Sequence, residues 1–123
     1  MPRDTESPSH LPVPPGNLFA PLPDTGPEEA VTPLLTTAAL RVERIVSRGH
    51  ASPAGFWYDQ SEDEWVCLLE GAAVLAFAEG GERRLQRGDW CLIPAGCRHR
   101  VVETSAPAVW LAVFCAAGNP GAP

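Results

Sequence analysis

The sequence predicts an all-β protein, an antiparallel sandwich or barrel that follows an extended, proline-rich N-terminal arm. Nine of the fourteen prolines lie within residues 1–33, and each one removes a backbone donor and fixes φ. From Leu40 onward, short β-rich runs alternate with Gly, Pro and Asp. No helical period of roughly 10–15 residues interrupts this series, so a parallel βαβ architecture is disfavoured.

The length of 123 residues corresponds to one domain. We expect residues 1–16 to be a disordered tail and residues 17–39 to be an extended arm, with one short turn near Glu28 to Leu35. The β domain then covers residues 40–116, and residues 117–123 form a C-terminal tail.

Eight runs in the domain read as strands. They are residues 40–47, 55–60, 64–71, 73–80, 83–89, 90–95, 98–104 and 109–116. Glu79-Gly80-Gly81-Glu82 lies between the fourth and fifth runs, where its paired glycines supply the positive φ of a two-residue hairpin turn.

Charge and composition exclude several classes of partner. Fifteen acidic against nine basic residues give a formal charge of -6, so nucleic acid and anionic membrane surfaces are not expected as partners. There is no run of about 18 apolar residues and no secretory signal at the N-terminus, which predicts a cytoplasmic location. The four cysteines form no CxxC pair, so we expect buried thiols rather than a zinc ribbon or a redox motif.

Two motifs carry a family resemblance. Gly88, Pro94, Gly96 and His99 follow the pattern Gly, five residues, Pro, any residue, Gly, two residues, His, and upstream Glu64 is followed after six residues by a glycine. These spacings resemble the second cupin signature and the second half of the first. Over residues 40–116 the chain therefore resembles a single-domain cupin, which implies a small jelly roll built as a double-stranded β-helix. More narrowly, it resembles a group of short bacterial cupins with no established activity.

The resemblance also implies a site inside the barrel. In a typical cupin, two histidines separated by one residue, a glutamate and the second-signature histidine hold a divalent metal. Here the paired histidines are missing. If three residues separate the second of these positions from Glu64, the two positions are Tyr58 and Gln60. If four residues separate them, the positions are Trp57 and Asp59. Strand alternation favours the first choice.

The predicted metal ligands are Gln60, Glu64 and His99, and they suit one divalent ion such as Zn, Fe, Mn or Ni. Tyr58, Asp59 and Glu103 are further candidates for ligand binding. Alternation places Glu103 on the same face as His99, at a position where the superfamily commonly has asparagine.

Two functions remain open at this point. One is a metal-dependent enzyme that acts on a small polar metabolite, with Glu64 or Glu103 available for proton transfer. The other is a metal-free, non-catalytic cupin that binds or senses a small molecule, with the same polar side chains orienting it. The fold alone does not decide between them, nor does it identify the reaction.

A homodimer is the expected assembly. Trp65, Cys67 and Leu69 alternate with the inward residues of their strand and form an apolar exterior stripe. An exposed sheet edge is a liability that a second copy or the N-terminal arm can cover.

Overall fold

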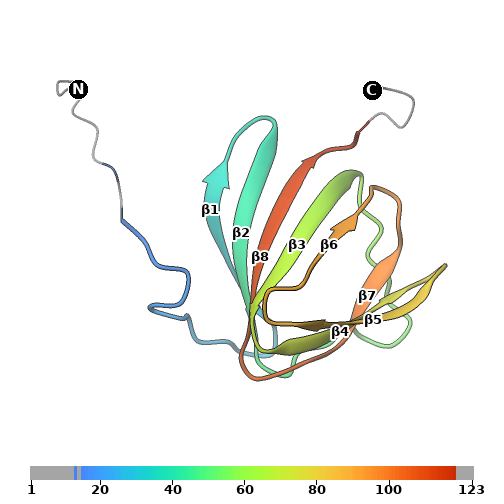
Figure 1. The fold of residues 1–123 in the computed structure, drawn as a ribbon, viewed down its shortest axis with the longest axis horizontal. Helices are drawn as coiled ribbons and strands as arrows, with labels where there is room; N and C mark the ends of the chain where they lie inside the picture. The colour runs from blue at the N-terminus through green and yellow to red at the C-terminus, as the bar shows by residue number, and fades with distance from the viewer. Residues whose placement is uncertain (1–12, 14, 119–123) are drawn as a thin grey trace.

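The computed structural model describes residues 13 and 15–118, and its regular structure consists of β-strands (Figure 1). The strands are β1 (Ala30–Thr36), β2 (Leu40–Ser47), β3 (Glu62–Glu70), β4 (Ala72–Phe77), β5 (Gly81–Gln86), β6 (Trp90–Ile93), β7 (His99–Thr104) and β8 (Ala108–Ala116). The predicted all-β class is confirmed. Nowhere in this described part is there a helix long and apolar enough to cross a membrane.

The strands form two antiparallel sheets that face each other. One sheet has the order β1-β2-β8-β3-β6, and the other has the order β5-β4-β7 (Figure 1). In β3 the side chains of Glu64, Val66 and Leu68 are buried and the residues between them are half-buried. This period of two is the pattern of a strand with one face toward a core.

The core lies between the two sheets. It is made of Val66, Leu68, Ala73, Leu75, Leu85, Cys91, Ile93, Ala108, Trp110, Ala112 and Phe114. The four cysteines are free thiols, but the expectation that they are buried holds for Cys91 alone, since the other three are half-buried. At about 25 cal/mol per Å² of apolar surface, burial of this cluster is the main force that holds the two sheets together.

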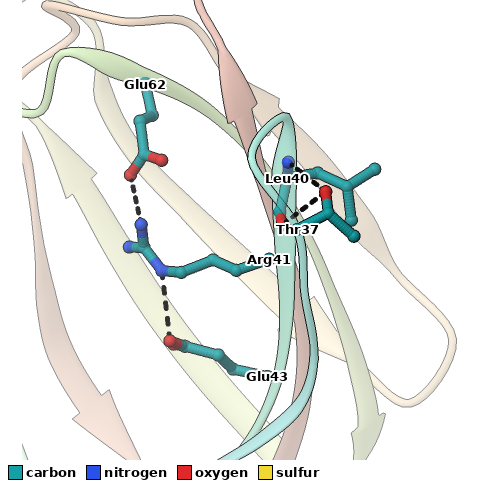
Figure 2. Close-up of polar contacts among 5 residues, drawn as sticks. All are labelled: Thr37, Leu40, Arg41, Glu43 and Glu62. Atoms are coloured by element: carbon teal, nitrogen blue, oxygen red, sulfur yellow. Dashed lines mark hydrogen bonds and ion pairs between the residues drawn. The ribbon is translucent and has the colours of Figure 1, made fainter.

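The expected turn between Glu28 and Leu35 is wrong, because this segment forms β1. β1 pairs with β2 at the edge of the five-stranded sheet, a position in which a strand tolerates a proline such as Pro33. The register shifts between Pro33 and Leu35. The turn into β2 is closed by the Thr37 hydroxyl, which accepts from the Leu40 N–H at 3.0 Å (Figure 2).

The arm before β1 is fixed to β2 and the loop after it. Arg44 donates to the carbonyls of Leu18 and Pro21, each at 3.4 Å, and Arg48 donates to the carbonyl of Pro23 at 2.9 Å. The arm is thus extended and docked through its backbone. Most of the predicted N-terminal tail, residues 1–12 and 14, lies outside the described residues. The same is true of residues 119–123 in the predicted C-terminal tail.

Two local predictions fail. Residues 55–60 form no strand, because only Tyr58 makes a bridge, with its N–H donating to the His99 carbonyl at 2.7 Å. The hairpin between β4 and β5 has three loop residues rather than two, since Phe77 pairs with Gly81. Gly81 has φ +74° and supplies the left-handed conformation at the end of this loop.

Candidate functional site

A cavity of about 260 Å³ lies between the sheets. Its polar lining is Glu29, Glu43, Tyr58, Gln60, Glu64 and His99, and its apolar lining is Val31, Ile45, Val66, Leu75, Ile93, Val101, Trp110 and Phe114. We call this cavity the barrel pocket. Of the six residues that the sequence singled out, four line it.

Glu64 and His99 lie at the buried side of the barrel pocket. Glu64 on β3 is 8% exposed and His99 at the start of β7 is 5% exposed, so both have left bulk water. Glu64 Oε1 lies 3.6 Å from His99 Nε2. This separation is longer than a hydrogen bond but within the range of an ion pair. The strands therefore bring together the two residues that the motifs predicted, although they come from different sheets.

The surroundings of His99 determine its protonation. Nδ1 lies 3.0 Å from the Cys97 carbonyl, so it carries a proton and donates to that oxygen. Nε2 then faces Glu64, as an acceptor in neutral imidazole or a donor in imidazolium. Burial disfavours the imidazolium, but the Glu64 carboxylate and the Cys97 carbonyl outweigh it, and the pKa of His99 is raised above its ordinary value.

Tyr58 and Gln60 complete the polar side of the pocket. The Tyr58 ring stacks on the His99 ring with centroids 5.4 Å apart, and Phe56 packs edge-on against Tyr58. Burial raises the pKa of the Tyr58 phenol, and the carboxylates of Glu29 and Glu64 raise it further. Gln60 is positioned by its backbone carbonyl, which accepts from the Gly96 N–H at 2.8 Å.

Asp59 and Glu103 do not reach the barrel pocket. Both are exposed, and neither lines the cavity. The expected shared face of Glu103 and His99 is wrong because β7 contains a bulge: Leu75 pairs with Val101, but Val74 pairs with Glu103. The extra residue reverses the direction of the side chains that follow it.

Sequence reasoning missed part of the pocket wall. Glu29 and Val31 come from the segment that was expected to turn, and Glu43 comes from a strand that was predicted but not considered for the site. Period-two alternation in LRVERIVS places Glu43 and Ile45 on one face, so a signal for these two existed. No local pattern places Glu29, whose carboxylate accepts from the Ser47 hydroxyl at 3.0 Å.

The polar residues fit a resident divalent metal only in part. The 3.6 Å between Glu64 Oε1 and His99 Nε2 is compatible with two ligands of one ion, which lie roughly 3–3.5 Å apart around a metal at about 2.1 Å. Within residues 13 and 15–118, however, no group of three or more His, Cys, Asp or Glu is arranged to hold an ion. A catalytic zinc site ordinarily has three strong protein ligands, and here the third donor would be the weaker Gln60 amide.

Comparison with solved structures agrees with this fold. A Ralstonia eutropha JMP134 protein, named as a candidate mannose-6-phosphate isomerase, is 47% identical, with a TM-score of 0.81 over 85% of this chain and 100% of that one. A sugar phosphate isomerase of the cupin superfamily from Silicibacter pomeroyi DSS-3 is 32% identical, with a TM-score of 0.51 over 63% of this chain and 51% of that one. A cupin superfamily protein from Desulfitobacterium hafniense DCB-2 shares the fold at 15% identity, with a TM-score of 0.70 over 88% of this chain and 96% of that one.

Sequence comparison gives the same family. An uncharacterized protein of Aquifex aeolicus (strain VF5) is 37% identical over 57 residues, and the match covers 46% of each chain. This chain thus matches less than half the length of that curated relative. The model of the cupin domain matches residues 45–114, which is more than half of the chain and includes Glu64, His99 and both motifs. The chain therefore belongs to the cupin domain family.

Proposed function

We propose that the barrel pocket binds a small polar metabolite, which Tyr58, Gln60, Glu64 and His99 orient. The observation that supports this most directly is the Glu64–His99 pair, which is buried and faces a cavity of about 260 Å³. A buried carboxylate is costly unless a partner compensates its charge. At 3.6 Å the pair leaves polar capacity that a ligand atom can satisfy.

The pair also has the chemistry for proton transfer. Neutral His99 keeps a lone pair on Nε2 because Nδ1 donates to the Cys97 carbonyl. A ligand O–H or N–H in the pocket therefore meets two acceptors, His99 Nε2 and a Glu64 oxygen, on one side. Two relatives are named for isomerisation of sugar phosphates, which are small polar molecules, and this supports a ligand of that general size.

A second candidate function is binding of one divalent ion by Gln60, Glu64 and His99. The observation in its favour is the separation of Glu64 Oε1 and His99 Nε2. The same pocket then holds the metabolite beside the ion. Zn, Fe, Mn and Ni all accept an imidazole together with oxygen donors.

Two measurements on protein purified without an affinity tag separate the candidates. Metal content is determined by mass spectrometry, and binding of neutral, anionic and cationic metabolites is followed by NMR shifts of backbone amides near His99. Stoichiometric metal that is lost in His99→Ala favours the second candidate. Metabolite binding without metal, weakened at least about 10-fold by Glu64→Gln, favours the first.

The control variant is Glu79→Gln, which removes a carboxylate that is 85% exposed on the β4–β5 loop. It should leave both metal content and binding unchanged. Parent protein that binds neither a metal nor any of the metabolites would refute the proposed function while leaving the fold assignment intact.

A further inference from the structure

The charge that lines the barrel pocket is mostly negative. Three carboxylates line it, from Glu29, Glu43 and Glu64, and among the described residues the only basic side chain in the lining is His99. The chain contains no lysine, so each of its nine basic residues is an arginine, and none of the eight arginines that the structure describes lines the pocket. An anionic group in the pocket would therefore meet carboxylates rather than guanidinium groups.

Arg41 contacts two residues of the pocket lining, Glu43 and Phe114, and its guanidinium is already paired. Figure 2 shows Arg41 between two carboxylates, with Nε 3.2 Å from Glu43 Oε2 and Nη1 2.6 Å from Glu62 Oε1. One guanidinium between two carboxylates leaves this group with a net negative charge. Arg41 therefore neutralises Glu43 without becoming free to bind a phosphate.

The other two carboxylates have no arginine partner in the described part of the chain. The only polar side-chain contact of Glu64 within the described part of the chain is His99 at 3.6 Å. Glu29 accepts from the Ser47 hydroxyl, which is a neutral donor. Both carboxylates thus line the same cavity as the Tyr58 ring.

The remaining wall suits a positive charge as well. Tyr58, Trp110 and Phe114 present aromatic rings to the cavity, and aromatic faces attract cations within about 6 Å. One native cation already uses this wall, because Arg41 Cζ lies 4.1 Å from the centroid of the Phe114 ring. Carboxylates combined with aromatic rings are a chemistry that recognises ammonium groups.

We propose that the barrel pocket is selective for a small aliphatic ammonium compound, whose charge lies between Glu29 and Glu64 and against the Tyr58 ring. This inference rests on the proposed function, because it specifies the chemical class of the molecule that the pocket binds. A cavity of about 260 Å³ limits that molecule to a compact one. The charged head pairs with the buried Glu64 and the half-buried Glu29, and the alkyl part contacts the apolar lining.

The test compares cations with uncharged molecules of similar shape. Binding of butylammonium and of butan-1-ol, of choline and of 3,3-dimethylbutan-1-ol, and of mannose 6-phosphate is measured by NMR titration of metal-free protein. We expect at least one cation to bind at least about 10-fold more tightly than its uncharged counterpart. Glu64→Gln and Glu29→Gln should each weaken binding of that cation at least about 5-fold and leave binding of the uncharged molecule unchanged.

Glu79→Gln is the matched control, and it should leave the affinity for the cation unchanged. Glu29→Gln keeps the test valid if Glu64→Gln fails to fold, because Glu29 is only half-buried. Tighter binding of mannose 6-phosphate or of the uncharged molecules would overturn the ammonium proposal and leave the proposed function standing. The proposal is also overturned if no cation binds, or if cation binding ignores both glutamate substitutions.

Discussion

At the scale of single residues, the site is a set of polar groups whose properties depend on neighbours from other strands. Glu64 comes from β3, His99 from β7 and Glu29 from the segment before β1. The charges of Glu29 and Glu64 both act on Tyr58, which is the only tyrosine of the chain. That phenol is therefore a built-in reporter of the electrostatics of the barrel pocket.

Titration of Tyr58 gives a prediction at this scale. Burial and the carboxylates of Glu29 and Glu64 disfavour the phenolate, so its pKa should lie above the ordinary value near 10. Glu64→Gln and Glu29→Gln should each lower that pKa, because each removes a negative charge, and Glu79→Gln should not. Absorbance near 295 nm against pH measures the pKa directly. An unchanged pKa in both pocket variants would contradict the convergence of the two carboxylates on Tyr58.

At the scale of secondary-structure elements, the turns decide where the strands can pack. Gly71 joins β3 to β4 with φ +92°, and a Cβ at this position would overlap the Ser105 hydroxyl and lie 2.5 Å from the Pro107 carbonyl. Two constraints therefore favour glycine at position 71: the left-handed backbone conformation and the close approach of the β7–β8 loop. Gly81 has a similar φ but open space around it.

Gly71→Ala should consequently destabilise the protein by about 2–4 kcal/mol, the sum of a left-handed residue and a steric overlap with backbone. Gly81→Ala carries only the conformational cost, about 1 kcal/mol. Urea unfolding of the two variants beside the parent measures the difference. Equal losses of stability would show that the approach of the β7–β8 loop to Gly71 contributes nothing.

The elements also show what the sequence could and could not predict. Seven of the eight strands lie where alternation and turn residues indicated them, because those signals are local. β1 was missed because prolines dominate its surroundings, and only an edge position with a register shift accommodates Pro33. The bulge that turns Glu103 outward was also missed, because it depends on pairing with β4. Glu64 and His99 were predictable because motif spacing fixes their places on two strands.

At the scale of the whole molecule, one surface is apolar. The register between strands aligns Trp65 with Val113 and Leu92, and aligns Cys67 with Leu111 and Trp90. These side chains lie on the face of the five-stranded sheet opposite to the core. Trp90 is 58% exposed and Leu92 is 60% exposed, both on the edge strand β6.

The homodimer expected from the sequence stays a prediction, with this face as its interface. Light scattering at micromolar concentration should give twice the mass of one chain. Leu92→Asp should shift that mass toward one chain, because it places a charge in the apolar face. Arg84→Asp, on β5 in the other sheet, is the control for a charge change on an exposed strand residue. A parent protein that scatters as a single chain would contradict the prediction.

The attachment of the N-terminal arm has a consequence for the composition of the pocket wall. The cupin domain match begins at residue 45, but Glu29 and Val31 precede it, and they line the pocket beside the Glu64–His99 pair. The residues before β1 are held to the barrel through the backbone carbonyls of Leu18, Pro21 and Pro23, which Arg44 and Arg48 bind, and β1 is held by its ladder with β2. These backbone contacts do not depend on the side chains at positions 29 and 31. Substitutions there should therefore change one wall of the barrel pocket while the strands that hold Glu64 and His99 keep their places.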